Sequence, residues 1–287
     1  MKRVVRGFWG PRKETVAELA VRWTELLTRL GALDGTVFGP WQGLPAPGDA
    51  QGGRGGRGGR GGQGGRGGRG GHGGQGGTVP VEQGAIEAYL RRQAGTAPDG
   101  DWADRTGHAM SLSTSPGNPA RVSVTGTGGG ESDHLAMSVV ITVTTPDGSD
   151  AAPPYAEALR ALAETWDVDW GEVTGTALQL ALEDAGRAPG EPCVGWAGYL
   201  SERRAAALAA ATAALESTDA DPTAPDPTAP DPTALVPGLT TARTAHGGLL
   251  LDAGAGAEVD DLVAFNRWLR ATGALEPLPR PMRRAKL

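Results

Sequence analysis

The sequence has little of the side chains that most often carry chemistry, with one cysteine and four histidines among 287 residues. The single cysteine, Cys193, excludes an internal disulfide and any zinc site built from several cysteines, which suits a reducing cytoplasm. None of the histidines stands at a metal-binding spacing such as His-Glu-x-x-His: His72, His108, His134 and His246. We therefore expect no catalytic residues, no metal and no cofactor, and we interpret Cys193 as a buried structural thiol.

Long apolar runs are also lacking. No stretch approaches the roughly 18 consecutive apolar residues that a membrane helix needs. The first six residues are charged, but no apolar segment follows them, so they do not read as a signal peptide. These absences predict a cytoplasmic protein with no membrane partner.

Two segments lack the apolar side chains that would offset the entropy of ordering them. Residues 51–77 are nine copies of an X-Gly-Gly triplet, and residues 219–234 are built mainly on a repeated Asp-Pro-Thr-Ala-Pro unit. The sequence therefore predicts one α+β domain over residues 1–287, interrupted by a disordered Gly/Arg-rich insertion at 51–77 and an Asp/Pro/Thr/Ala-rich linker at 219–234.

The formal net charge is -6, and the triplet repeat carries five arginines and no acids, which leaves the other residues at -11. An acidic body argues against a general DNA-binding domain, whose footprint is a basic face. Its charge fits simple solubility or a basic protein partner. The repeat itself resembles an RNA-binding Arg-Gly-Gly segment without interleaved Phe or Tyr, so drift in a tolerant loop and weak nucleic-acid contact both remain open.

Hydrophobic periodicity predicts helices and strands that do not strictly alternate. Thr15 and Glu18 have capping-box spacing at the start of one helix, and Gly31 is its expected stop. Helices are expected at 15–30, 82–93, 155–166, 173–185, 205–215 and 259–271. Strands are expected at 3–9, 121–125, 135–144, 193–200 and 249–251. The strands 121–125 and 135–144 form a predicted hairpin joined through 125–130. This order favours an α+β fold with an antiparallel sheet.

Residues 147–191 hold ten acids and only two arginines. Trp170 stands among them, beside Asp167, Asp169 and Glu172. An aromatic side chain surrounded by carboxylates suits an interface anchor with a charged rim. We therefore predict that these four residues bind a protein partner, whereas the competing interpretation is a solvated acidic surface.

Two motifs and the chain's ending carry a family resemblance. Val-Val-Arg-Gly-Phe-Trp-Gly-Pro-Arg at 4–12, Val-Gly-Trp-Ala-Gly-Tyr-Leu-Ser at 194–201 and Gly-Ala-Leu at 273–275 resemble the immunity protein 52 family of bacterial polymorphic toxin systems. The resemblance implies an α+β protein that binds and neutralises a cognate toxin, typically one with a restriction-endonuclease-like nuclease domain, and that is not an enzyme. The two repeats depart from the family pattern. The alternatives are a nucleic-acid-associated protein that uses the Arg-Gly-Gly repeat, and an uncharacterised enzyme.

Overall fold

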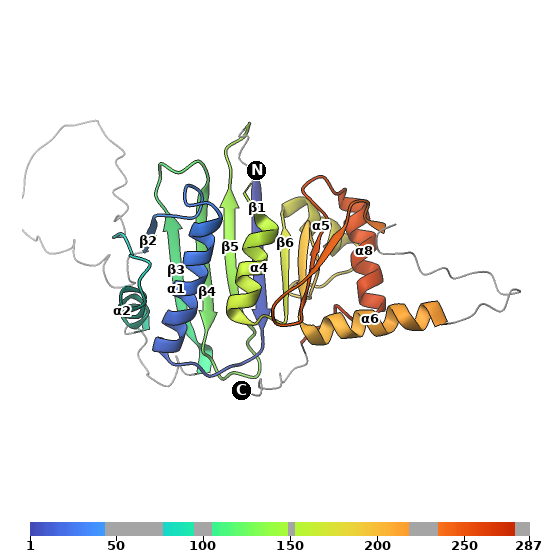
Figure 1. The fold of residues 1–287 in the computed structure, drawn as a ribbon, viewed down its shortest axis with the longest axis horizontal. Helices are drawn as coiled ribbons and strands as arrows, with labels where there is room; N and C mark the ends of the chain where they lie inside the picture. The colour runs from blue at the N-terminus through green and yellow to red at the C-terminus, as the bar shows by residue number, and fades with distance from the viewer. Residues whose placement is uncertain (44–76, 95–104, 149–152, 218–234, 279–287) are drawn as a thin grey trace, which may run out of the picture.

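The protein folds around one nine-stranded antiparallel sheet (Figure 1). The computed structural model describes residues 1–43, 77–94, 105–148, 153–217 and 235–278. The strand order is β2-β3-β4-β5-β1-β6-β7-β9-β8. The strands are β1 (Lys2–Trp9), β2 (Trp41–Gly43), β3 (His108–Thr114), β4 (Arg121–Gly128), β5 (Met137–Thr144), β6 (Trp170–Thr174), β7 (Ala197–Leu200), β8 (Thr240–Arg243) and β9 (Leu249–Asp252). The helices described with them are α1 (Val16–Leu33), α2 (Gln83–Ala94), α4 (Tyr155–Trp166), α5 (Thr176–Asp184), α6 (Glu202–Ser217) and α8 (Val259–Ala271). The predicted α+β class with an antiparallel sheet is confirmed.

The N-terminal strand β1 lies in the middle of the sheet, paired with β5 on one side and β6 on the other. Its side chains alternate, so that Val5, Gly7 and Trp9 are buried against the helices α1 and α4. Gly7 is required there, because a Cβ atom would lie 2.8 Å from Cγ1 of Val168. Strand β5 is also internal, as predicted, with Ile141 fully buried.

Helix α1 begins with the predicted capping box. The Thr15 hydroxyl accepts from the Glu18 amide at 3.3 Å, and the Glu18 carboxylate accepts from the Thr15 amide at 2.7 Å. The apolar stripe of α1 faces the sheet, and Trp23 meets Trp166 of α4 edge-on at 4.9 Å between centroids. The predicted stop at Gly31 is wrong: the helix continues to Leu33 and ends at Asp34, whose carboxylate accepts from the Thr36 and Val37 amides.

Two hydrophobic clusters lie on opposite faces of the sheet. The larger one fills the space between the sheet and helices α1 and α4. The smaller one joins Leu200 of β7 and Leu251 of β9 to Leu178 of α5 and to Leu262 and Phe265 of α8. The strands β7 and β9 are therefore covered on both faces, whereas β3, β4 and β5 have a helix layer on one face.

Several predicted boundaries are wrong, and four strands were not predicted. Residues 173–174 belong to β6 and not to the following helix, because both faces of β6 are buried and no alternation marks it. The strand expected at 193–200 is confined to Ala197–Leu200, and residues 126–128 extend β4 instead of forming a connection. The strands missed in the sequence are β2, β3, β6 and β8.

The two repeats lie outside the described residues, apart from Gly77, so their predicted disorder and the single-domain division stay predictions. Within the described residues, no helix combines the length and apolar character that crossing a membrane would require.

Candidate partner-binding surface

The four residues predicted to bind a partner lie at the end of α4 and in the strand that follows. Asp167 is the left-handed C-cap of α4, with φ 48°, and it is exposed. Trp170 is only 3% exposed, and its ring stacks on Phe8 at 4.7 Å between centroids. An interface anchor has to be reachable by the partner, so Trp170 does not meet the condition for that role. The contribution of the three acids to partner binding stays a prediction.

Asp169 is held inside the protein by two consecutive arginines of α6. Its carboxylate accepts from Arg204 at 2.7 and 2.9 Å and from Arg203 at 3.1 Å. Arg204, which is 1% exposed, also donates to the backbone oxygens of Ala274 and Glu276. Burial opposes the ionised form of Asp169, but the arginines outweigh it and lower the pKa of the carboxyl. The hydrogen bonds of Arg204 to Ala274 and Glu276 fasten α6 to the segment that follows α8.

Glu172 is also internal, at 2% exposure. Its carboxylate accepts from the Cys193 thiol at 2.6 Å and from the Gln179 side-chain amide at 3.3 Å, and it lies 3.5 Å from Nε of Arg6. Burial raises the pKa of Glu172. Burial, and next the charge of Glu172, raise the pKa of Cys193 well above its usual value. Cys193 is thus a buried, protonated thiol, as predicted, and a poor nucleophile.

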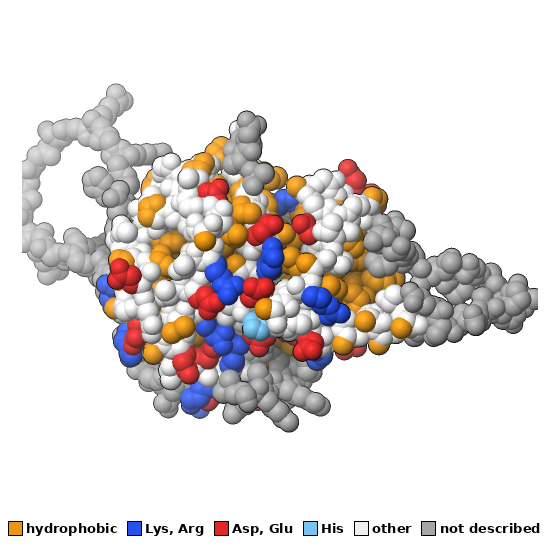
Figure 2. All heavy atoms as spheres, viewed as in Figure 1, with side chains coloured by type: hydrophobic (Ala, Val, Ile, Leu, Met, Phe, Trp, Pro, Cys, Tyr) orange, Lys and Arg blue, Asp and Glu red, His pale blue; other side chains and the backbone are white. Residues whose placement is uncertain are grey.

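The acidic excess of residues 147–191 is largely neutralised in three dimensions. Nine of its ten acids are described, and six of these make ion pairs, with Met1, Arg6, Arg29, Arg187, Arg204 or Arg270. Only Arg187 comes from the acidic segment itself. Figure 2 accordingly shows acidic and basic side chains intermixed across the face that carries α1 and α4. The local excess in the sequence does not make a continuous acidic patch on this face.

A different surface, on the opposite side of the sheet, is not covered by any helix that the structure describes. We define the open sheet face as the alternate positions of β1, β3, β4 and β5 that point away from α1 and α4. Every member is exposed or partly exposed, while the adjacent positions along the same strands are mostly buried. Its members are Lys2, Val4, Arg6, Phe8, Ala109, Ser111, Ser113, Arg121, Ser123, Thr125, Thr127, Ser138, Val140, Thr142 and Thr144.

Strand register brings these side chains into rows. One row runs across Ser113, Ser123, Thr142 and Val4, and the next across Ser111, Thr125, Val140 and Arg6. Eight of the fifteen members carry a hydroxyl, which can both donate and accept a hydrogen bond. No member carries a carboxylate.

The open sheet face has a clear boundary on each side. Lys2 and Arg121 flank Thr144 at one end of the strands, which gives that end a basic character. On the β6 side the same face passes under α5, where Arg6 meets the buried Glu172. A hydroxyl-rich sheet surface of this kind can make an extended contact with another surface. Sequence patterns did not indicate this face, because β3 was not predicted.

The three histidines that the structure describes do not converge. His108 lies in β3, His134 in the turn between β4 and β5, and His246 in the turn between β8 and β9. In the part of the chain that the structure describes, no group of three or more His, Cys, Asp or Glu side chains is arranged to hold a metal ion.

Comparison with known proteins adds one distant structural likeness. No protein-family model matches the chain, and no curated protein matches it. Among solved structures, a Pseudomonas aeruginosa T6SS protein aligns over 96% of this chain and 73% of its own, with a TM-score of 0.46 and 12% identity. That likeness is too distant to carry a functional argument.

Proposed function

We propose that this chain is an immunity protein that binds a cognate nuclease-type toxin and neutralises it by binding and not by catalysis. The observation that carries the proposal is the open sheet face. No described helix covers this face of the four adjacent strands, whereas α5 and α8 cover the same face of β7 and β9.

An antiparallel sheet can simply face water on one side, so exposure alone does not indicate a partner. The composition of the open sheet face is the stronger argument. Eight of its fifteen members carry a hydroxyl and none carries a carboxylate, although Asp and Glu number 33 in the whole chain. Surfaces that stay in water normally mix both signs of charge, whereas the three charged members of this face, Lys2, Arg6 and Arg121, are all basic. Val4, Phe8 and Val140 add apolar area among the hydroxyls.

The family resemblance supports a toxin as the partner. Its two principal motifs coincide with internal strands, because residues 4–9 form most of β1 and residues 197–200 form β7. The glycines in the second motif are needed for close packing: a Cβ on Gly195 would collide with the backbone oxygen of Val173. These motifs therefore belong to the internal strands that build the sheet. The open sheet face is the surface of that sheet that we propose for partner binding.

The experiment is co-production with the toxin encoded by the adjacent gene. We expect the chain to protect cells from the toxin's C-terminal domain and to co-elute with it in size-exclusion chromatography. A variant lacking residues 51–77 should protect equally well. Loss of protection in that deletion would favour the nucleic-acid alternative, and the absence of both a complex and protection would contradict the proposal.

A further inference from the structure

Two of the three charged members of the open sheet face lie together at one end of it. Lys2 of β1 and Arg121 of β4 stand directly opposite Thr144 of β5, one on each side, and all three residues are exposed. Neighbouring strands are spaced by about 4.8 Å, so the two cations stand roughly 10 Å apart with a hydroxyl between them. The name basic row is used below for Lys2, Thr144 and Arg121.

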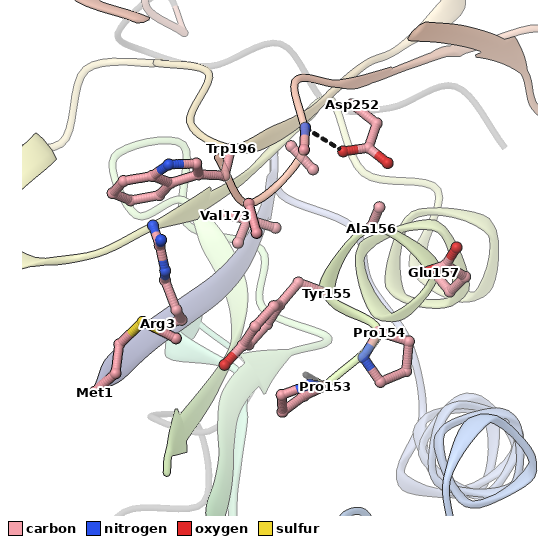
Figure 3. A pocket seen from close by; sticks show the side chains of 13 residues that line it. Met1, Arg3, Pro153, Pro154, Tyr155, Ala156, Glu157, Val173, Trp196 and Asp252 are labelled. Carbon is pink, nitrogen blue, oxygen red and sulfur yellow. Dashed lines mark hydrogen bonds between the residues drawn. The ribbon is translucent and has the colours of Figure 1, made fainter. Parts of the chain in front are cut away.

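The two cations of the basic row are not neutralised by the residues that the structure describes. Neither Lys2 nor Arg121 makes an ion pair with any of them. Asp147, just beyond the end of β5, pairs instead with the N-terminal amine at 3.3 Å. Arg3 points to the other side of the sheet, where its guanidinium carbon lies 3.1 Å from the centroid of the Trp196 ring (Figure 3). The basic row therefore presents two unpaired positive charges to a partner.

The third charged member, Arg6, lies nearer the centre of the face and differs from the other two. Its Nε atom is 3.5 Å from the buried carboxylate of Glu172, so its charge is already matched within the protein. The members beside it on β1, β4 and β5 are valines, serines, threonines and Phe8. The open sheet face thus has a centre without net charge and one end with two positive charges.

The lack of carboxylates on this face restricts which surface of a toxin can dock on it. A groove that binds nucleic acid presents Lys and Arg to the phosphates. A protein that fills such a groove has to supply negative charge in place of the phosphates, and no member of the open sheet face does so. Like charges brought together across an interface oppose docking. The nucleic-acid groove of a nuclease is therefore not the surface that this face matches.

We propose that the toxin docks through a surface outside its nucleic-acid groove, which places carboxylates of Asp or Glu against the basic row and uncharged groups against the centre of the open sheet face. Lys2 and Arg121 donate charge-assisted hydrogen bonds to these carboxylates. The inference rests on the proposed function and adds the mode of neutralisation, because the chain then binds the toxin without taking the place of its substrate.

This partner chemistry differs from the one that the net charge of the chain indicates. A formal charge of -6 fits a basic partner, but that value averages over every face of the protein. Long-range attraction depends on the whole charge distribution, whereas the docked complex depends on the charges that meet in the contact. The contact charges of the open sheet face are basic.

The first measurement is calorimetry of the toxin's nuclease domain with the full chain and with a charge-reversed variant, Lys2→Glu with Arg121→Glu. The matched control reverses one exposed arginine on α2 and one on α4, Arg92→Glu with Arg160→Glu, so that both variants change the net charge equally. The charge-reversed variant should bind at least about tenfold more weakly than the control, a difference of roughly 1.4 kcal/mol.

Circular dichroism confirms the fold of both variants. The neutral pair Lys2→Gln with Arg121→Gln replaces the charge-reversed variant if that variant does not fold. Its affinity should fall several-fold and should depend less on salt than the affinity of the wild type, because two screened attractions are lost.

The second measurement determines whether the toxin holds nucleic acid and the chain at the same time. A catalytically inactive toxin is loaded with a short fluorescent DNA or RNA duplex, and the full chain is added while fluorescence anisotropy is followed. The anisotropy should rise as a ternary complex forms. The affinity of the chain for the toxin should change less than about threefold, because ligands at separate sites affect each other only through coupling between the sites.

Release of the duplex in step with binding of the chain would overturn the inference, and so would equal affinities of the charge-reversed variant and its control. If the chain alone binds the duplex and loses that binding on charge reversal, while toxin binding is unchanged, the basic row belongs to a nucleic-acid surface and the inference is wrong. These results leave the immunity function standing. That function fails separately, if the wild-type chain forms no complex with the toxin.

Discussion

The two halves of the sheet differ in how they are covered. Strands β6, β7 and β9 have helices on both faces, and all the residues of β6 and β7 are buried. Strands β3, β4 and β5 have helices on one face, and most of their side chains alternate between buried and exposed or partly exposed. The β6 half is built for stability, including an internal polar network around Glu172. The β3 to β5 half packs on helices through one face, and its other face is the surface that we propose for partner binding.

The largest expected effect is at the junction of the halves, where Trp170 stacks on Phe8. Trp170→Ala should lower the free energy of unfolding by about 3–5 kcal/mol, the usual cost of removing a large buried aromatic. Urea denaturation measures it. A loss below about 1 kcal/mol would show that Trp170 is not part of the core and would restore it as a possible interface anchor.

Two neighbouring residues of β5 lie on opposite faces of the β3 to β5 half of the sheet. Ile141 is fully buried and Thr142 belongs to the open sheet face. Ile141→Ala should cost about 2–5 kcal/mol, whereas Thr142→Ala should cost less than about 0.5 kcal/mol. Equal losses at the two positions in thermal or urea unfolding would mean that both faces of β5 are covered.

The buried Glu172, in the β6 half of the sheet, should make the stability of the protein depend on pH. Because its pKa is raised on folding above the unfolded value of 4.5, its contribution to stability is fully present below that pH and is lost as pH rises through the folded pKa. Glu172→Gln removes this titration, while the nearby Arg6, Arg187 and Cys193 remain. Unfolding measured from pH 4 to pH 8 (about the range in which a raised carboxyl titrates) should show the wild type losing stability relative to the variant. Parallel curves would contradict the assignment.

The smallest expected effect is on the association rate with the toxin, when the charge of Asp167 is removed. Asp167 is exposed, and an asparagine tolerates its left-handed backbone. If its charge steers the toxin, Asp167→Asn should lower the association rate only a few-fold and make that rate less dependent on salt. Stopped-flow association with the toxin measures both. An unchanged rate and salt dependence would remove Asp167 from the interface.

Local patterns predicted much of the scaffold. The amphipathic helices 155–166 and 259–271 match α4 and α8, and the β-branched run of β5 marks an internal strand. Strand β3 was missed because its alternate positions are small serines and an alanine, which carry no strong strand signal. Strand β6 was missed because both of its faces are buried and its acids suggested a surface.

The candidate site was less predictable than the fold, since it depends on contacts between distant segments. Glu164 pairs with Arg29, and Asp169 with Arg204, so the acidity of the segment is cancelled by residues far away in the sequence. The open sheet face forms only when β1, from the start of the chain, pairs with β5. No local window contains both strands.

The most direct test of partner binding by the open sheet face is calorimetry with the toxin and a variant that carries two lysines there, Thr125→Lys with Thr142→Lys. The matched control places two lysines on exposed positions of α1, on the other side of the sheet, with Val21→Lys and Thr28→Lys. Both variants should fold by circular dichroism. We expect the open-face variant to lose about 100-fold or more in affinity for the toxin, because docking would bury two unpaired charges. The affinity of the control should stay within about twofold of the wild type. Wild-type affinity in a folded open-face variant would contradict the claim that this face binds the partner.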